Sequence, residues 1–486
     1  MLLASCAADD FPIPAADGPL SLEIRYPTAE PVSVTDSISV WGSVGSGKAH
    51  LRINGQSVRI ERNGAFATFV PIPPHDPPTL QLEASKGDAV IRRSLVITRA
   101  THAPPRSADP RPAARWIRLR RPGSDTVDAA TQARPIYGRW TPGGELALPL
   151  PQGIRLMVDA ETPEALRLRL ARDISVWVSR ADAEAAGPRP ATPRVGSARL
   201  TQSAAGSVIE LPMAEPLPMA AEVVQTRLRW TLFGARAAAA VPIQAGQGLV
   251  RGVAVRDAGD GRVLVEVTLA ASPLGWRTRW RNGRAVLEVR PAPPAGAGLE
   301  GLIVALDPGH PPEGAIGPTG LTEDSLTLAV VLETAKRLRA LGARPVLTRR
   351  DTAPVSLEAR IALAESAGAQ LFVSVHANAP GDGRPPWSVD ATSTFWLRPH
   401  SQRLAKELGD SVAAALHQAK GGAIQSDLAV LRPTWFPAVL VEGTALVLPA
   451  REAYLRSPAG IAAYAAGLVA GIRAWVEGPR IGGPAR

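Results

Sequence analysis

The spacing of apolar residues changes at about residue 300, and this change restricts the fold more than any other feature of the chain. From 300 to 478, short apolar runs such as 302–306 and 371–375 follow one another along the chain. Between them lie longer segments, such as 404–416 and 461–475, whose apolar residues recur at helical spacing. Strands that alternate with helices form a sheet with helices on its faces. We therefore predict an α/β domain, a twisted mixed sheet flanked by helices, over residues 300–478.

The chain before residue 300 has a different pattern, which is typical of short strands. Leu20, Leu22 and Ile24 alternate with polar residues, and Asn54-Gly55 is a dipeptide that often joins two strands of a hairpin. We therefore predict a multidomain protein in which several all-β domains precede the α/β domain. Segments rich in Pro, Ala and Gly, which we interpret as linkers, lie at 11–19, 101–113, 186–194 and 291–299. The predicted parts are 1–19 as signal remnant and linker, 20–100 as a β-sandwich, 115–187 and 195–291 as β-rich domains, and 300–478 as the catalytic domain.

Length and charge narrow the range of functions. The 486 residues are enough for three or four domains. The formal net charge of +10 comes almost entirely from arginine and is spread along the chain without a block of like charges. A nucleic-acid-binding protein would carry a clustered basic patch, so we expect no nucleic-acid partner. A diffuse positive charge suits an anionic polymer such as a cell wall. No run of about 18 uncharged apolar residues is present, so we expect no membrane-spanning helix.

Polar side chains follow three of the predicted strands at the point where each strand ends. His310 follows the first strand through a Pro-Gly turn, His376 follows the strand at 371–375, and Glu442 directly follows another apolar run. Active sites of α/β sheets lie at the carboxyl ends of the strands. Glu323, at the start of a predicted helix, adds a fourth group. Two imidazoles and a carboxylate are a common ligand set for catalytic zinc, which keeps its fourth position for water.

Each of these residues also has a structural interpretation that needs no metal. A single His at a strand end is most often a hydrogen-bonded loop residue. An acid at a helix N-terminus, such as Glu323, is favoured by the helix dipole. Glu442 is harder to explain in this way, because a carboxylate directly after an apolar strand would be partly buried and would need a partner. Among the remaining histidines, His400 is the one further candidate for the site.

Six motifs follow one another between residues 302 and 478. In chain order they are Ala305-Leu306-Asp307-Pro308-Gly309-His310, Gly320-Leu321-Thr322-Glu323, Leu347-Thr348-Arg349, Ser356-Leu357-Glu358-Ala359-Arg360, Phe372-Val373-Ser374-Val375-His376-Ala377-Asn378 and Pro437-Ala438-Val439-Leu440-Val441-Glu442. Their order and spacing resemble the zinc-dependent N-acetylmuramoyl-L-alanine amidases of the type 3 family. The resemblance implies that His310, Glu323 and His376 bind Zn²⁺ and that Glu442 is the catalytic acid/base. It implies a peptidoglycan hydrolase that cleaves the amide bond between N-acetylmuramic acid and L-alanine, in cell-wall remodelling or daughter-cell separation.

Two segments depart from the family pattern. Pro311-Pro312 follow the first His, where the family usually has glycines, and Gly443-Thr444 follow the catalytic Glu, where a Phe and an Asn are usual. Both changes concern the walls of the substrate groove rather than the ligands. Some family members carry an inhibitory helix inserted after the second His. Segment 379–391 has little room for one, so we expect this enzyme not to be blocked in that way.

The β-rich parts resemble modules of bacterial envelope proteins. Residues 20–100 resemble an immunoglobulin-like domain, and 115–187, with Trp177-Val178, resemble an SH3-like domain. Residues 195–291 resemble the β-rich targeting module that often precedes this class of amidase. We interpret these modules either as structural spacers or as domains that bind the wall or a partner. An envelope activator protein stays open as a further partner besides peptidoglycan.

The N-terminal residues bear on localisation. Leu3-Ala4-Ser5-Cys6 resembles the lipobox of bacterial lipoproteins, in which the cysteine is acylated. Only five residues precede Cys6, fewer than a signal sequence needs, and the alternative is a cysteine in a frayed tail. We expect the cell envelope or periplasm, with membrane attachment only through a lipid on Cys6.

Two other functions remain open at this point. One is a different zinc hydrolase on a similar sheet, such as a peptidase, which would cut within the stem peptide. The other is a wall-binding protein with an inactive amidase-like domain. The presence of all four polar site residues argues against the second, because an inactive site has no reason to keep a full ligand set.

Overall fold

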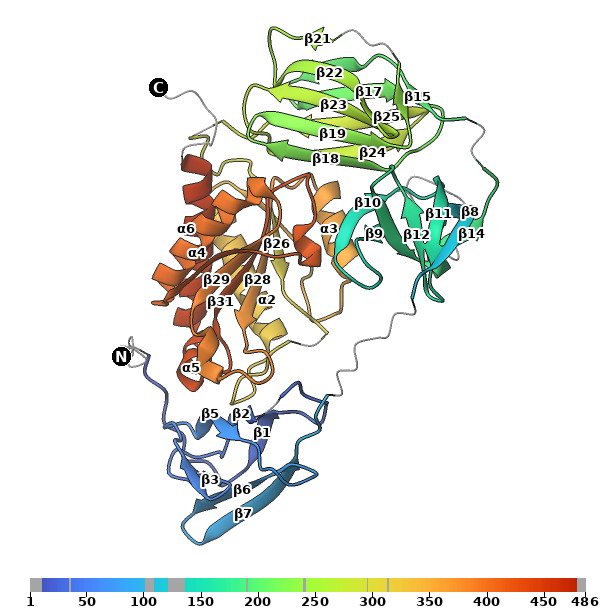
Figure 1. Ribbon diagram of the computed structural model, residues 1–486. Coiled ribbons are helices and arrows are strands. Elements are labelled where there is room, and N and C mark those ends of the chain that lie inside the picture. The colour runs from blue at the N-terminus through green and yellow to red at the C-terminus, as the bar shows by residue number, and fades with distance from the viewer. Residues whose placement is uncertain are drawn as a thin grey trace, which may run out of the picture. The chain divides into compact units, whose positions relative to one another are not determined.

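The computed structural model confirms the predicted fold class, an α/β domain with a mixed sheet that follows several β-rich parts (Figure 1). It describes residues 11–34, 36–100, 109–120, 136–188, 191–238, 242–294, 296–312 and 314–478. Its contacts divide the chain into two compact units, Met1–Ala103 with Ala295–Gly478 and Pro104–Pro294 with Pro479–Arg486. The predicted acylation site, Cys6, lies outside the described residues.

Residues 11–100, hereafter the first β-domain, form a sandwich of two antiparallel sheets. Its strands are β1 (Glu23–Tyr26), β2 (Ser37–Ser43), β3 (His50–Ile53), β4 (Gln56–Val58), β5 (Ala65–Pro71), β6 (Thr79–Lys86) and β7 (Ala89–Val96). One sheet has the order β1-β2-β5 and the other β4-β3-β6-β7. Val40, Phe66 and Leu82 belong to one core shared by both sheets, because alternate side chains of each strand point to the same face. Asn54 and Gly55 both have positive φ, 51° and 77°, as a two-residue hairpin between β3 and β4 requires.

The second unit contains two further β-rich parts. The first is one sheet of β8 (Arg111–Leu119), β9 (Ile136–Arg139), β10 (Leu146–Leu150), β11 (Arg155–Glu161), β12 (Ala165–Arg169), β13 (Ser175–Ser179) and β14 (Ala183–Ala185). The order of its strands is β10-β9-β13-β12-β11-β8-β14. Strand β8 begins at Arg111, inside the segment 101–113 that we predicted to be a linker. The first half of this strand is largely exposed, so it lacks the apolar alternation that marks a strand in the sequence.

The second β-rich part of this unit consists of a four-stranded and a five-stranded sheet that share one core, and of a separate two-stranded sheet of β15 and β20. Its strands are β15 (Arg194–Val195), β16 (Arg199–Ser203), β17 (Gly206–Pro212), β18 (Met219–Val224), β19 (Arg227–Phe233), β20 (Arg236–Ala237), β21 (Ile243–Gln244), β22 (Val250–Gly259), β23 (Arg262–Leu269), β24 (Gly275–Arg281) and β25 (Arg284–Arg290). Trp230 and Trp276 lie in the core between the sheets. Phe233 belongs instead to the core of the preceding sheet, so apolar contacts join the two parts.

The α/β domain supplies the remaining elements. They are β26 (Ile303–Pro308), α2 (Glu323–Ala340), β27 (Arg344–Leu347), α3 (Leu357–Ser366), β28 (Leu371–Asn378), η3 (Pro386–Val389), β29 (Thr392–Trp396), η4 (Pro399–Ser401), α4 (Gln402–Ala415), β30 (Lys420–Gln425), η5 (Ala429–Leu431), β31 (Ala438–Ala445), α5 (Pro449–Arg456) and α6 (Pro458–Glu477). The strand order is β27-β26-β28-β31-β29-β30. Strands β26, β27, β28 and β31 run parallel, whereas β29 is antiparallel to β31. The carboxyl ends of β26, β28 and β31 therefore meet at one edge of the sheet.

Helices cover both faces of this sheet (Figure 1). Helices α2, α4 and α6 pack together on one face, and α3 with η5 packs on the other. Strand β30 has no signal in the sequence, because its six residues are all exposed and two of them are glycines. An exposed edge strand has no buried face, and therefore no alternation that the sequence could reveal.

Helix α6 is apolar because it is a core helix. Within the described part of the chain it is the one helix whose length and composition would suit a membrane span, but over half of its apolar window is buried inside the protein. Gly467 and Gly471 lie against the backbone of α4, and an added Cβ would come within 2.8 Å of Val412 Cα and 2.7 Å of Leu408 Cα respectively. The two glycines thus let α4 and α6 approach closely.

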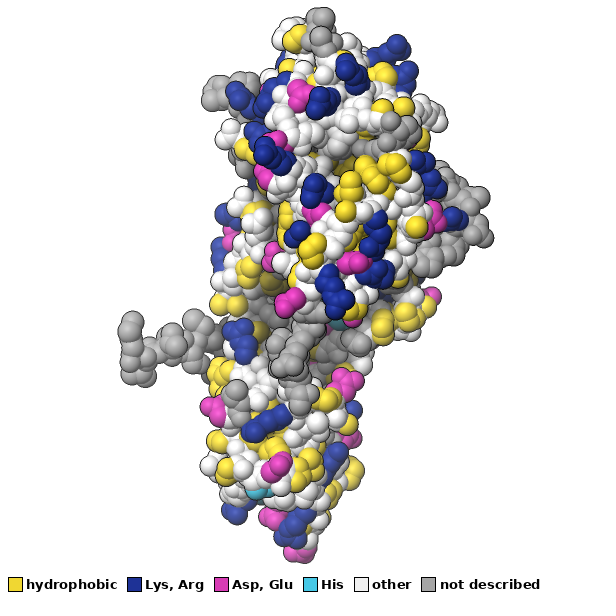
Figure 2. Space-filling view, turned by 45° about the vertical axis from the view of Figure 1, so that its right-hand side comes forward, with side chains coloured by type: hydrophobic (Ala, Val, Ile, Leu, Met, Phe, Trp, Pro, Cys, Tyr) yellow, Lys and Arg dark blue, Asp and Glu magenta, His cyan; other side chains and the backbone are white. Residues whose placement is uncertain are grey.

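The positive charge of the protein is dispersed over its surface. Figure 2 shows Lys and Arg side chains scattered over the face that it presents, with Asp and Glu side chains among them. Many arginines form ion pairs with nearby acids, as Arg167 does with Asp159 and Arg92 does with Glu83. The net charge therefore creates a diffuse field on this face rather than a basic patch.

Candidate active site

His310 is the first polar side chain after β26, and the backbone presents it in an unusual conformation. Its φ is +60°, which is uncommon for a residue with a side chain. Gly309 precedes it, and a Cβ at that position would lie 2.4 Å from Cε1 of His376. Only glycine therefore lets the end of β26 approach the second histidine this closely. The guanidinium of Arg360 donates a 2.8 Å hydrogen bond to the His310 carbonyl and holds the turn in place.

Glu323 is the first residue of α2 and lies at the centre of the site, only 4% exposed. Its Oε2 accepts a hydrogen bond from the backbone N–H of Ala315 at 2.9 Å. Its Oε1 accepts one from the N–H of Ala377 at 3.0 Å. The carboxylate is thus oriented by the loop before α2 and by the end of β28.

The two histidines contact the same carboxylate. Nε2 of His310 lies 3.2 Å from Oε2 of Glu323, and Nδ1 of His376 lies 3.0 Å from Oε1. The histidine rings are 5.0 Å apart at an interplanar angle of 77°. Burial alone would raise the pKa of Glu323, but the hydrogen bonds from His310 and His376 hold it well below its usual range. The carboxylate is therefore ionised at neutral pH.

This cluster fits a divalent metal ion. One ligand atom from each of His310, Glu323 and His376 lies within 4.8 Å of the other two. Donors that share a tetrahedral zinc at bonds of roughly 2.0–2.1 Å are about 3.3 Å apart, close to the two separations above. The ligand types, two His and one carboxylate, are those of catalytic zinc sites.

Glu442 lies on β31, next to the cluster. Parallel pairing of β28 and β31 places it in register with His376, and Ser393 of β29 is its partner on the other side. Burial raises its pKa to about 7, against the opposing effect of His376. Its Oε2 is buried and accepts no hydrogen bond from the residues that the structure describes. A carboxylate with this pKa can both take up and release a proton near neutral pH.

A network of buried polar side chains connects the elements that carry the site. Asp307, 2% exposed, accepts hydrogen bonds from Thr348 Oγ1 at 2.5 Å and from Ser374 Oγ at 2.7 Å. Arg360 Nη1 forms a 2.9 Å ion pair with the same carboxylate and donates to the Pro308 carbonyl. The network ties β26, β28 and the start of α3 together. We did not assign a function to these residues from the sequence, although a charge at the end of an apolar strand is a usable signal.

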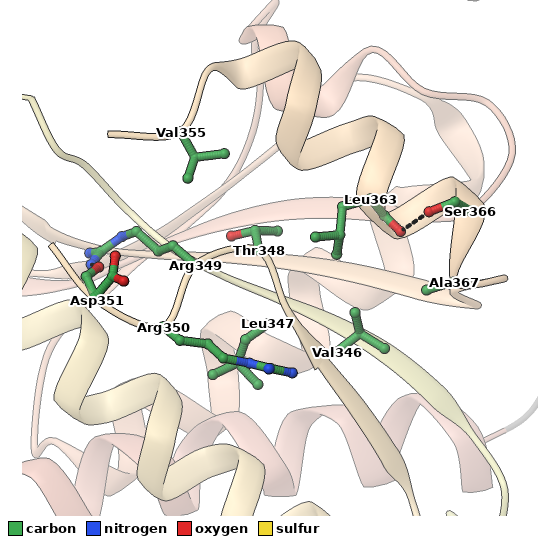
Figure 3. A pocket seen from close by; sticks show the side chains of 10 residues that line it. All are labelled: Val346, Leu347, Thr348, Arg349, Arg350, Asp351, Val355, Leu363, Ser366 and Ala367. Carbon is green, nitrogen blue, oxygen red and sulfur yellow. Dashed lines mark hydrogen bonds between the residues drawn. The ribbon is translucent and has the colours of Figure 1, made fainter. Parts of the chain in front are cut away.

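Arg349 also stabilises the turn that carries His310. Its guanidinium donates to the carbonyls of Pro308, Gly309 and Asp324. Its backbone lines a cavity of about 550 Å³ between the end of β27 and α3, but its side chain extends toward Asp351 (Figure 3). None of the four predicted site residues lines this cavity, so we do not regard it as the substrate site.

Tyr464 of α6 contacts the two strands that carry His376 and Glu442. Its hydroxyl lies 2.8 Å from the His376 carbonyl and 3.2 Å from the Val441 carbonyl, and it donates to these oxygens. Gly443 lies against its ring, where an added Cβ would approach within 2.3 Å. The sequence analysis did not single out Tyr464, because it lies on a helix far along the chain from both strands.

The structure brings the four predicted site residues together and leaves one candidate apart. His310, Glu323 and His376 form the cluster, and Glu442 lies beside it. His400 lies in η4, where it interacts with the Phe436 backbone, and burial lowers its pKa to about 4. His400 is therefore not part of the cluster.

The family comparison concerns the α/β domain. Residues 304–474 match the family model described as N-acetylmuramoyl-L-alanine amidase. This range contains His310, Glu323, His376 and Glu442 and excludes the β-rich parts.

Three relatives illustrate the similarity. LytC of Bacillus subtilis, an N-acetylmuramoyl-L-alanine amidase, is 36% identical over 155 residues, which cover 32% of this chain and 31% of LytC. YqiI of the same bacterium is 34% identical over 173 residues, which cover 34% of this chain and 81% of YqiI. AmiC of Neisseria meningitidis, also an N-acetylmuramoyl-L-alanine amidase, is 29% identical over 232 residues, covering 38% of this chain and 56% of AmiC. The chain thus spans about a third of LytC and just over half of AmiC.

Proposed function

Because this chain belongs, through residues 304–474, to the type 3 family of N-acetylmuramoyl-L-alanine amidases, we propose that it is a zinc-dependent peptidoglycan hydrolase. Its substrate is the amide bond between N-acetylmuramic acid and the L-alanine of the stem peptide. The observation that carries the proposal is the cluster of His310, Glu323 and His376, with the protonatable Glu442 in register on the next strand.

The ligand residues have distinct functions in this mechanism. His310, Glu323 and His376 would hold the zinc ion, which when bound polarises the substrate carbonyl and lowers the pKa of water. The amides of Ala315 and Ala377 orient the Glu323 carboxylate, and Tyr464 orients the His376 backbone. The protein thus fixes the ligands before the metal and the substrate bind.

Glu442 carries the proton. As a carboxylate it accepts a proton from the attacking water, and as a carboxylic acid it delivers that proton to the leaving nitrogen of L-alanine. Burial raises the pKa of Glu442 above its ordinary value, which keeps the protonated form that the second step needs accessible. Because its Oε2 has no hydrogen-bond donor among the described residues, this oxygen is available to a water or to the substrate.

The proposed function also implies where the protein acts. A peptidoglycan hydrolase acts in the cell envelope, and the dispersed positive charge favours approach to an anionic wall. A lipid on Cys6 would keep the protein at a membrane surface. An envelope activator would act at the β-rich parts or at the loops around the site.

The test is digestion of purified peptidoglycan with the zinc-loaded full chain, followed by mass analysis of the soluble products. We expect intact stem peptides with a free L-alanine amine, and no release after chelation or with Glu442→Gln. Fragments cut within the stem peptide would indicate a peptidase instead. Binding of peptidoglycan without any release would indicate an inactive wall-binding domain.

A further inference from the structure

The outer face of one sheet of the first β-domain is buried. In β2, Ile38 and Val40 point into the sandwich core, so Ser39 and Trp41 point to the opposite face. That face would be open to water in an isolated sandwich, yet Ser39 is 2% exposed and Trp41 is 5% exposed. Strand β5 of the same sheet contacts α5 and η3 of the α/β domain. The first β-domain therefore packs against the α/β domain through this sheet.

Trp41 binds the loop that leads to Glu323. This segment, residues 314–322, is hereafter the first loop. The indole Nε1 of Trp41 donates a 2.9 Å hydrogen bond to the Ile316 carbonyl. Ile316 directly follows Ala315, whose N–H donates to the Glu323 carboxylate and whose carbonyl accepts from the Glu323 N–H. The hydrogen bond from Trp41 thus ends at the residue next to Ala315, whose backbone groups orient Glu323.

The indole is itself held in position. Tyr26 stacks on Trp41 with ring centroids 4.4 Å apart and an interplanar angle of 9°. On the far side of the first loop, the buried Glu452 of α5 accepts hydrogen bonds from the amides of Thr319 and Leu321. The first loop is therefore fixed from the first β-domain on one side and from α5 on the other.

The same sheet binds the loop that follows His376. This segment, residues 379–391, is hereafter the second loop. The Tyr26 hydroxyl donates to Asp382 Oδ1 at 2.6 Å, and the Ser33 N–H donates to Asp382 Oδ2 at 2.8 Å. Ser39 Oγ donates to the Arg384 carbonyl at 2.6 Å. Three groups of the first β-domain thus hold two neighbouring residues of the second loop.

Neither loop has much secondary structure of its own. The second loop contains the 3-10 helix η3 and is rich in Pro and Gly, and the first loop contains the isolated bridge between Ile316 and Thr322. Segments with few internal hydrogen bonds open readily unless other parts of the protein hold them. Both loops contain a few turn hydrogen bonds, such as those from Gly320 to Gly317 and from Ser388 to Pro385, and the contacts described above add to these.

We propose that the first β-domain is a structural part of the active site rather than a spacer, and that Trp41 and Tyr26 are positioning residues for the metal cluster. Trp41 orients Glu323 through the first loop, and Tyr26 fixes the second loop beside His376. This inference rests on the proposed function, because the two loops can affect catalysis only if they border a zinc site. It predicts that the α/β domain alone binds zinc more weakly than the full chain does.

The experiment uses the full chain with Trp41→Phe and Tyr26→Phe. Tyr26→Phe removes only the hydroxyl donor, whereas Trp41→Phe removes the indole N–H together with part of the ring that stacks on Tyr26. Trp140→Phe is the matched control, because Trp140 is 52% exposed in the second unit. Two quantities are measured: the dissociation constant of Zn²⁺ alone, by competition with a chromophoric chelator, and amide hydrogen exchange of the two loops and of β28.

We expect Trp41→Phe to accelerate exchange in the first loop and Tyr26→Phe to accelerate it in the second loop, with β28 unchanged. Zinc binding should weaken roughly three- to tenfold with Trp41→Phe, the range expected when one hydrogen bond that supports a ligand is lost. Trp140→Phe should match the wild type in every measurement. Unchanged loops and zinc affinity in both variants would overturn the proposal. Acceleration that is uniform and includes β28 would also overturn it, because the residues would then contribute only to global stability.

These readouts separate this inference from the proposed function. A wild-type protein that binds zinc but releases nothing from peptidoglycan would contradict the proposed function. The exchange and zinc measurements would still decide whether the first β-domain positions the two loops.

Discussion

Glu442 and His376 are direct neighbours in the sheet, because the parallel pairing of β28 and β31 puts them in register. One strand therefore carries a metal-ligand candidate, and the neighbouring strand carries a carboxylate whose pKa burial raises to about 7. The proposed proton carrier and the proposed metal ligand His376 are thus held together by backbone pairing, which is stiffer than a contact between two loops.

Replacing Glu442 with Gln removes the proton carrier and keeps the shape of the side chain. We expect turnover of peptidoglycan to fall about 10²–10⁴-fold, the usual contribution of a general acid/base. Zinc affinity should stay close to that of the wild type, since Glu442 is not one of the clustered ligands. Product release and zinc content, measured on the same preparation, check both parts. A variant that keeps near-normal turnover would remove Glu442 from this function.

Replacing Glu323 with Gln tests the central ligand. We expect zinc affinity to fall by about 100-fold or more, because a carboxylate ligand is lost and both histidines lose their common partner. Zinc should also raise the unfolding temperature of the wild type, but not that of the variant, since only a ligand that binds the folded state stabilises it. Glu333→Gln, on the same helix but outside the cluster, is the matched control and should bind zinc normally. Equal zinc affinity in both variants would contradict the assigned ligand set.

Replacing Asp307 with Asn breaks a buried ion pair with Arg360, both residues being 2% exposed. An unpaired buried guanidinium is costly, so we expect a loss of about 3–5 kcal/mol in the free energy of unfolding. Asp427→Asn breaks a more exposed pair with Arg432 and should cost less than about 1 kcal/mol. Urea denaturation of the two variants measures the difference. Similar losses in both variants would mean that the buried network around Asp307 does not stabilise the fold.

His400 should make the protein sensitive to acid. Burial lowers its pKa from 6.5 to about 4, so below pH 6.5 the unfolded chain binds the proton more tightly than the folded one. The stability contribution of the neutral imidazole is therefore complete above pH 6.5. As the pH falls from 6.5 toward 4 the free energy of unfolding decreases, and the decrease is about 2 kcal/mol at pH near 5.

His400→Gln removes this titration, and His50→Gln, at an exposed position, is the matched control. Denaturation at pH 7 and at pH 5 should show a smaller loss on acidification for His400→Gln than for the wild type, with His50→Gln unchanged. An identical pH dependence in all three proteins would show that His400 is not the group responsible.

Local patterns were enough to predict the α/β domain and the location of its site. The runs at 302–306 and 371–375 are apolar because both faces of a central strand are buried, and a polar residue after such a run marks a strand end. His310 and His376 could be found in this way. Strand β30 could not, because its six exposed residues carry no alternation. Strand β8 was placed partly in a linker for the same reason.

The supporting residues depend on pairs that are distant in the chain. Asp307 and Arg360 are 53 positions apart, and Trp41 and Ile316 are 275 positions apart. Nothing in the periodicity of either segment indicates which partner it meets. The sequence favoured a spacer or a binding module for the first β-domain, whereas the structure shows Trp41 of its β2 strand hydrogen-bonded to Ile316, in the loop before Glu323.

The sequence by itself determined most strands and helices of the α/β domain, the positions of His310, His376 and Glu442 directly after apolar runs of its sheet, and the ligand chemistry that these residues offer. These properties follow from residue type and from neighbours within a few positions, which a linear pattern records. Only the tertiary structure decided that Glu323 lies between the two histidines, that burial raises the pKa of Glu442, and that Trp41 holds the first loop. Each of these depends on which distant segments exclude water from one another, and that is a property of the packed chain.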